Sequence, residues 1–368
     1  MAEQGRGGRR RSADPGAVEA GRRLRLARMA AGLSQSQLAE TCGVSRQAIA
    51  GAEAGVWSPS LAVALQLARA LGATVDQLFA TGAKGRPVAA TALAPGDPGA
   101  RARITRVWDR WVSLPLARDR ALVAGFAPAS GVLGAVAGSA QLWGAGRSLV
   151  VAGCDPALPL LAGPIAAAGE GWSLDWWSCG SDVARRLLGD GLVHAAAVHY
   201  PTSLPQPRRR QPSARRLGFA RWREGLVLRP GQKGRVRSVA DAIRLGLVWV
   251  NREPGAEARR LLDQQLELLG CRPPSVPGYR VEASGHLQVA SLVSCRAADV
   301  GVATEPAALA FGLDFIPLSE EECALLVAPE RLDTPELRLL LTVLAGPQLR
   351  RELDALPGYD PTIAGAEL

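Results

Sequence analysis

The sequence predicts a multidomain α+β protein, with an all-α N-terminal domain and a C-terminal α/β domain. Its 368 residues are enough for two or three domains of ordinary size. The first 80 residues hold short amphipathic segments that follow serines and end at glycines, a pattern typical of small helices. From Ser148 onward, short apolar runs alternate with helical patterns, which is typical of strands joined by helical crossovers.

The composition is that of a globular chain whose positive charge is unevenly placed. Hydrophobic residues make up 48% and charged residues 21%, which excludes a largely disordered chain and a collagen-like fibre. Residues 1–86 carry twelve basic and six acidic side chains, so +6 of the formal net charge of +9 lies there. This excess predicts a polyanionic partner, and nucleic acid is the first candidate. The six cysteines form no CxxC pair, so we expect reduced, mostly buried thiols and no zinc ribbon.

The N-terminal part divides into a basic arm at residues 1–15 and a helical domain at residues 16–80. The arm GRGGRRR is expected to be disordered and to attract phosphates without reading sequence. Helices are predicted at residues 17–31, 35–41, 46–54 and 61–72, with a short closing turn or helix at residues 75–79. Ser34 and Ser45 are the expected N-caps of the second and third helices.

The stretch LSQSQLAETCGVSRQAIAGAE at residues 33–53 has the spacing of two short helices joined by a glycine turn. This geometry places a helix N-terminus in the major groove of double-stranded DNA. There Arg46 and Gln47 can reach guanine and adenine edges, while Ser34 and Gln35 favour a phosphate at the preceding helix N-terminus. With SPSL and ALQLARALGATVDQLF, the stretch resembles the Cro and repressor type of helix-turn-helix domain over about 65 residues. Gly51 departs from a strong helix sequence, and a protein-interaction module is the alternative.

Residues 81–147 are expected to form a linker and a β-rich connecting segment. Residues 81–101 are rich in Gly, Ala and Pro and predict the linker, whereas residues 104–116 predict a strand or hairpin. The uncharged segment 121–146 contains Pro128 and mostly small residues, so we expect no membrane span. Since no apolar stretch follows the basic N-terminus, we expect a cytoplasmic protein.

The C-terminal domain, residues 148–368, predicts a mostly parallel sheet with right-handed crossovers. Ligands of such sheets lie beyond the carboxyl ends of the strands, near helix N-termini. A helix is expected directly after Asp155, its N-cap, and small residues at strand-to-helix turns offer backbone N–H groups to a small anion. These turn residues are Gly153, Ser178, Gly180, Ser181, Ser284 and Gly285.

Several side chains of this domain are candidate ligand-binding groups, each with a structural alternative. Cys154 follows a strand, where a reactive thiol is conceivable, but the sequence motifs offer it no His or Asn partner, so a packed residue is favoured. His194 and His199 lie on opposite faces of one strand because their separation is odd. His286 opens a helix and could donate to an anion. Asn251 and Arg252 end a strand, where ligand contact and turn stabilisation are equally open. The seven arginines of RRRQPSARRLGFARWR favour a solvated face.

Phrases in residues 148–360 resemble the periplasmic-binding-protein-like domain of cytoplasmic regulators linked to molybdate or molybdopterin. They are VVAGCDPAL, SCGS, GLVHAAAVHY, WREGLVLRPG, VNREPGAEARRLLD, GYRVEASGHLQVASLVSCRAADVGVATEPAALAFGLDFIPL and LPGYD. The resemblance implies a two-lobed clamp that closes on a small anionic ligand, and adds Arg259 and Glu282 to the candidate ligand residues. Family members often carry Gly-Ser-Gly-Thr-Arg where this chain has Gly-Ala-Glu-Ala-Arg at residues 255–259, which puts simple oxyanion binding at that turn in doubt.

Together these observations predict a one-component transcriptional regulator that binds operator DNA as a homodimer. The sensed ligand would be molybdate or tungstate, with molybdopterin or another small molecule as the alternative. No resident cofactor or metal is expected. An enzyme that uses Cys154 is a less favoured reading.

Overall fold

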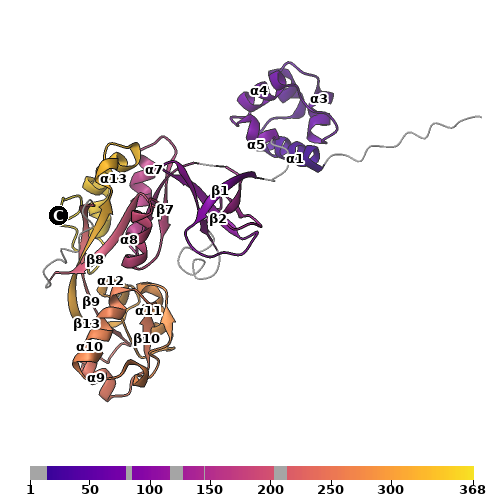
Figure 1. Cartoon of the computed structure of the whole chain (residues 1–368). Coiled ribbons are helices and arrows are strands. Elements are labelled where there is room, and N and C mark those ends of the chain that lie inside the picture. Colours follow the sequence, from indigo (N-terminus) through magenta and orange to yellow (C-terminus); the bar gives the residue numbers. More distant parts are fainter. Residues whose placement is uncertain (1–14, 80–84, 117–126, 145, 203–213) are drawn as a thin grey trace, which may run out of the picture. The chain divides into compact units, whose positions relative to one another are not determined.

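The computed structural model describes residues 15–79, 85–116, 127–144, 146–202 and 214–368. The chain divides into two units, Met1–Gly85 and Arg86–Leu368, and each is described by itself (Figure 1). The basic arm up to residue 14 and the three arginines at 208–210 lie outside the described residues. In the described parts, no helix is both long and apolar enough to cross a membrane.

The first unit is the predicted set of small helices. They are α1 (Pro15–Ala30), α2 (Gln35–Thr41), α3 (Arg46–Glu53), α4 (Leu61–Ala70) and α5 (Val75–Phe79). Leu24, Leu38, Ile49 and Leu67 are fully buried and come from the first four helices. Gly43 has φ 61° between α2 and α3, a backbone conformation that glycine adopts without strain.

The second unit begins with a closed five-stranded barrel in the order β1-β3-β2-β4-β5. Its strands are β1 (Arg86–Ala92), β2 (Arg101–Val107), β3 (Arg110–Pro115), β4 (Gly131–Leu133) and β5 (Ser139–Leu142). The hairpin predicted at residues 104–116 is confirmed by the antiparallel pairing of β2 with β3. The linker predicted at residues 81–101 is wrong for residues 86–92, which pair with β3 and β5. Pairing with distant strands outweighs the local Gly/Ala/Pro composition there.

The rest of the second unit is built on one eight-stranded sheet in the order β11-β10-β12-β9-β13-β8-β6-β7. The strands are β6 (Arg147–Ala152), β7 (Trp172–Trp177), β8 (Ala195–Pro201), β9 (Arg215–Leu228), β10 (Trp249–Arg252), β11 (Glu282–Ala283), β12 (Val300–Thr304) and β13 (Asp314–Val327). Strands β6, β7 and β8 belong to one lobe, and β10, β11 and β12 to the other. The two long strands β9 and β13 run through both lobes (Figure 1).

The sheet is parallel within each lobe, as predicted, but antiparallel at its centre. Strand β13 pairs antiparallel with β8 and β9, and β9 pairs antiparallel with β12. The pairing of β13 with β9 is irregular between Pro317 and Ser319 and again between Cys323 and Ala324. The two lobes are therefore joined by a pair of continuous strands.

Helices cover both faces of the sheet. They are η1 (Leu158–Leu161), α7 (Ala162–Ala167), α8 (Ser181–Gly189), α9 (Val239–Arg244), α10 (Glu257–Leu268), η2 (Pro273–Ser275), α11 (His286–Ser294), α12 (Glu305–Ala310), η3 (Pro329–Arg331), α13 (Pro335–Ala345) and α14 (Pro347–Asp354). Leu149 packs with α13 on one face, whereas Val150 packs with α8 on the other.

The single helix expected after Asp155 is broken into η1 and α7. Pro159 and Pro164 lie in this stretch and lack a backbone N–H, so they interrupt regular helical hydrogen bonding. Asp155 instead accepts a hydrogen bond from the Ala157 N–H at 2.7 Å.

Candidate functional site

The N-terminal unit presents the start of α3 to solvent. The Ser45 hydroxyl accepts a hydrogen bond from the Ala48 N–H at 3.1 Å and so caps the helix. Arg46 and Gln47 follow at its first two positions, and both are exposed. This is the placement that base contact by a helix N-terminus requires.

A partly buried ion pair fixes α3 against the helices before it. The Arg28 guanidinium donates to the Glu53 carboxylate at 2.6 and 3.2 Å, and the Gln35 amide donates to the same carboxylate at 2.8 Å. Burial raises the pKa of Glu53, but the hydrogen bonds from Arg28 and Gln35 outweigh it and hold that pKa below its usual value. Gln35, predicted to favour a phosphate, therefore also ties α2 to α3.

Ser34 caps α2 in a reciprocal arrangement. Its hydroxyl accepts from the Gln37 N–H at 3.2 Å, and the Gln37 side-chain oxygen accepts from the Ser34 N–H at 2.8 Å. The side chain predicted as a phosphate contact is thus engaged in setting where the helix begins.

A second cluster of polar side chains lies between the two lobes of the sheet. Cys154 follows β6, His199 lies on β8, and His286 opens α11. The Cys154 sulfur and a ring nitrogen of each histidine lie within 4.8 Å of one another. All three residues are buried, with exposures of 5%, 2% and 1%. The fold therefore brings together three residues that the sequence placed more than 40 positions apart.

His199 is held between the thiol and a buried carboxylate. Its Nδ1 lies 3.2 Å from Glu321 Oε2, and the Ser319 hydroxyl donates to Glu321 Oε1 at 2.6 Å. Burial lowers the pKa of His199, but the charge and hydrogen bond of Cys154, with the hydrogen bond of Glu321, raise it well above its usual value. Cys154 thus has the histidine partner that motif inspection did not find. His194 lies on the other face, as predicted, where its Nδ1 accepts from the Val150 N–H at 2.9 Å.

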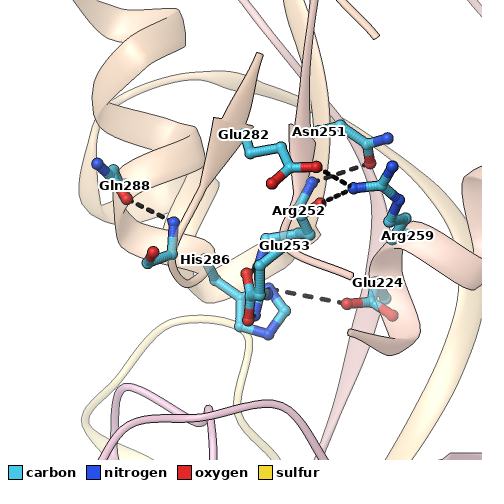
Figure 2. A network of polar contacts seen from close by, with 9 residues as sticks. Glu224, Asn251, Arg252, Glu253, Arg259, Glu282, His286 and Gln288 are labelled. Carbon is cyan, nitrogen blue, oxygen red and sulfur yellow. Dashed lines mark hydrogen bonds and ion pairs between the residues drawn. The ribbon is translucent and has the colours of Figure 1, made fainter. Parts of the chain in front are cut away.

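His286 is a neutral hydrogen-bond donor toward the cluster. The Arg252 Nη1 lies 3.0 Å from His286 Nδ1 (Figure 2). Since arginine can only donate, Nδ1 accepts, and a neutral ring then carries its proton on Nε2. Burial, together with the charges of Arg252 and His199, holds the pKa of His286 well below its usual value. Arg252 itself is neutralised by Glu253, with two hydrogen bonds of 2.8 Å.

Glu224, on β9, brings a buried carboxyl group without a hydrogen-bond partner among the described residues into the same cluster. Its side chain is 1% exposed, and its Oε1 lies 3.7 Å from His286 Nδ1 (Figure 2). Burial raises the pKa of Glu224 to about 7. Among the described residues, neither carboxyl oxygen has a hydrogen-bond partner.

Further buried atoms around the lobe boundary lack a hydrogen-bond partner within the described ranges. They are Asp155 Oδ2, Ser181 Oγ, His286 Nε2 and Thr304 Oγ1. Buried polar groups are normally hydrogen-bonded, so this set fits a small molecule that supplies the missing donors and acceptors. Asp155 is otherwise occupied through Oδ1, which accepts from Ala157 N–H and from the Tyr359 hydroxyl at 2.8 Å. Burial raises the pKa of Asp155 to about 6.

The remaining predicted ligand residues of the second lobe support the strand ends. Asn251 Oδ1 accepts from the Arg252 N–H at 2.9 Å, and its amide donates to the Tyr279 carbonyl at 3.4 Å. Arg259 donates to the Arg252 carbonyl at 2.9 Å and to Glu282 Oε1 at 2.7 Å (Figure 2). For Asn251, these contacts favour turn stabilisation over the equally open ligand contact.

Two glycines set the turns of the first lobe. A Cβ on Gly153 would lie 2.6 Å from the Cβ of Ala197, so only glycine fits before Cys154. Gly180 lies two residues after Ser178 and directly before Ser181, the first residue of α8. It lies so close to the second lobe that a Cβ on it would be 3.1 Å from the Gly255 carbonyl oxygen.

An ion pair between Asp182 of α8 and Arg260 of α10 also crosses from lobe to lobe. Glu257, the departure noted at the 255–259 turn, pairs with Arg260 as well. The described conformation is therefore a closed one.

The cluster fits a resident metal ion poorly. Cys154, His199 and His286 are close enough together to be ligands, as are His199, Glu224 and Glu321. However, Arg252 leaves the proton of His286 on Nε2, and a metal needs that nitrogen deprotonated. The raised pKa of His199 opposes ligation in both sets.

Sequence reasoning missed the two buried glutamates, although strand alternation carried a signal. Glu321 shares a strand face with Cys323 and Leu325, and both of these are buried. Glu224 likewise shares a strand face with the buried residue Leu226. A charged residue on the apolar face of a strand is a candidate functional group.

Comparison with known proteins agrees with this architecture. Residues 162–345 match the model of the PBP superfamily domain, and residues 19–80 match that of a helix-turn-helix domain. The uncharacterised protein YvgK of Bacillus subtilis is 33% identical over 141 residues, which cover 38% of this chain and 45% of that protein. An uncharacterised HTH-type transcriptional regulator of Methanothermobacter thermautotrophicus is 51% identical over 49 residues, or 13% of this chain and 71% of that protein.

Among solved structures, a putative phosphate ABC transporter substrate-binding protein from Clostridium perfringens has a TM-score of 0.44 at 12% identity. That match covers 58% of this chain and 99% of the other. The matched family model spans half of the sequence and the two lobes described above. The chain therefore belongs to the PBP superfamily, with a helix-turn-helix domain ahead of its PBP-like domain.

Proposed function

We propose that this chain is a ligand-responsive transcriptional regulator. In this proposal α3 reads operator DNA through Arg46 and Gln47, and the two lobes close on a small molecule. The exposure of both side chains at a capped helix N-terminus supports the first part. The unpartnered buried atoms between the lobes support the second part.

The regulator would act as a homodimer on an inverted repeat. Helix-turn-helix dimers of this kind contact half-sites about 34–36 Å apart, one turn of DNA. Ligand-induced closure would change the placement of the two α3 helices, with a coupling free energy of about 1–3 kcal/mol.

Two ligand classes compete for the inter-lobe cluster: molybdate or tungstate, and a larger molecule of the molybdopterin type. The observation that carries the choice is the pair of unpartnered oxygens on Glu224. An ionised carboxylate repels a dianion in a buried site, whereas it accepts hydrogen bonds from paired N–H groups such as those of a pterin ring. Glu224 therefore favours the pterin-type ligand.

Thermal unfolding distinguishes these ligands. We would measure the melting temperature at pH 8 with molybdate, tungstate, sulfate and neopterin. A ligand at about 100 times its Kd stabilises by about 2.7 kcal/mol, which is a shift of about 5 °C for a unit of roughly 280 residues. A shift with neopterin that disappears in Glu224→Gln, but persists in the exposed control Glu267→Gln, supports the proposal. A shift with molybdate and tungstate alone would restore the oxyanion reading.

DNA binding is tested separately, by fluorescence anisotropy on the DNA upstream of the protein's own gene. We expect salt-sensitive binding that prefers this DNA to a scrambled duplex. Arg46→Ala should lose that preference, while Arg69→Ala, an exposed arginine on α4, should keep it. Equal affinity for both duplexes would refute the proposal that this chain is a transcriptional regulator.

A further inference from the structure

The order Cys154, His199, Glu321 between the lobes is that of a nucleophile, a base and the group that orients the base. We propose that the cleft carries a cysteine nucleophile, and that Cys154 accepts an acyl group from a small carboxylic ester or amide. His199 would transfer the proton, and Glu321 would position His199. This activity goes beyond ligand sensing and does not require it.

The contacts of His199 carry the proposal. One of its ring nitrogens lies within 4.8 Å of the Cys154 sulfur, and its Nδ1 lies 3.2 Å from Glu321 Oε2. A hydrogen-bonded nucleophile, base and orienting group define such sites irrespective of fold. Glu321 is itself fixed by the Ser319 hydroxyl at 2.6 Å, so the histidine is held in one orientation.

The backbone presents the thiol at a suitable place. Cys154 lies in the turn that leaves the carboxyl end of β6, where ligands of α/β sheets gather. Gly153 lies against Ala197 so closely that no other residue fits before the cysteine. The thiol therefore faces the lobe boundary from a rigid strand end.

Two unpartnered groups nearby complement an acyl substrate. The neutral His286 carries a proton on Nε2 that has no acceptor among the described residues, so it can donate to the oxygen that becomes negative during attack. The bare oxygens of Glu224 can accept from the N–H of a leaving amine. This second feature favours amides over esters as natural substrates.

In the first step, the Cys154 sulfur forms a bond to the carbonyl carbon, and the C=O electron pair moves onto oxygen. When the pair returns, the bond from carbon to the leaving group breaks, and His199 gives the leaving group the proton that came from the thiol. A thioester on Cys154 results. Water then attacks the thioester, His199 takes the proton from water and returns it to the departing sulfur, and a carboxylic acid is released. No oxidation or reduction occurs.

The test uses 4-nitrophenyl acetate with the full-length protein at pH 8. We expect a burst of 4-nitrophenol close to one equivalent, and an acetyl adduct on the peptide that contains Cys154. Cys154→Ser should abolish the burst, and His199→Gln should slow it by about 100-fold or more. Cys295→Ser, which removes an exposed thiol outside the cluster, should leave it unchanged.

Because the described conformation is closed, Arg260→Gln provides a second variant that lacks the ion pair between the lobes. It should acylate at least as fast as the wild type. Absence of acetyl-Cys154 in both proteins, while Cys295 is labelled, would overturn the proposal, as would a rate of Cys154 acylation that His199→Gln does not change. DNA binding and the neopterin shift are measured on the wild type, so failure here and failure of the regulator are distinguishable.

Glu321→Gln tests positioning by the pH profile of the burst. The neutral amide no longer favours the charged imidazolium, so His199 loses its proton at lower pH and half-maximal acylation should move to lower pH. The other titratable or charged groups around His199 are Asp155, Glu224, Arg252, His286 and Cys323. They are unaltered in this variant, and an unshifted profile would contradict the role of Glu321.

Discussion

Replacing Glu224 by glutamine should stabilise the second unit at alkaline pH and change little at acid pH. Burial raises the pKa of this carboxyl group from the ordinary value of 4.5 to about 7. A group with a raised pKa in the folded state contributes stability that is fully present below its unfolded pKa, and that is lost as pH rises through its folded pKa. The wild type should therefore lose stability between about pH 4.5 and 7, because the buried carboxylate ionises without a hydrogen-bond partner among the described residues.

The rise of the Glu224 pKa from 4.5 to about 7, at about 1.4 kcal/mol for each pH unit, corresponds to about 3.5 kcal/mol of unfolding free energy. With an unfolding entropy of about 2.1 cal/mol/K per residue over roughly 280 residues, this equals about 6 °C in melting temperature. This difference in melting temperature is measured by differential scanning calorimetry at pH 4 and pH 8. The proteins compared are the wild type, Glu224→Gln and the exposed control Glu267→Gln. An advantage for Glu224→Gln of equal size at both pH values would refute the reasoning, since glutamine would then act by packing rather than by charge.

Three other changes have defined outcomes. Arg46→Ala should weaken operator binding about tenfold or more without altering the melting temperature of the helical unit, as anisotropy and circular dichroism would show. Glu53→Gln should destabilise that unit by about 1–3 kcal/mol above pH 5. Because the pKa of Glu53 is lowered in the fold, this penalty should vanish as pH falls through that lowered pKa, and a penalty that persists in acid would contradict the Arg28 pairing. Asp182→Asn removes a half-exposed ion pair with Arg260, so we expect neopterin affinity to fall by no more than about fivefold, and a larger loss by calorimetry would mean that Asp182 contacts the ligand.

Local signals were sufficient for the helical unit but not for the inter-lobe cluster. Ser34, Gly43 and Ser45 mark where helices begin and turn, and each acts within four residues of itself. By contrast, Cys154 meets His199 only because β6 and β8 are neighbours in the sheet. Such long-range pairing leaves no trace at motif level in a single sequence.

The same limit explains the errors in the connecting segment and the sheet. Residues 86–92 have the composition of a linker, yet they become a strand because β3 and β5 supply partners. The antiparallel centre of the sheet arises from β9 and β13, and the apolar pattern of a strand does not indicate its direction. Tertiary pairing decided both outcomes.

The irregular register of β13 lies close to the Glu321–His199 pair. Glu321 lies between the two register shifts at Pro317/Ser319 and Cys323/Ala324, on one of the two strands that join the lobes. If the clamp bends at these register shifts, the distance from Glu321 to His199 changes with it. By reciprocity, a change in the charge on that imidazole would then change the preferred angle of the clamp. The protonation of His199 and the opening of the lobes would then be thermodynamically coupled.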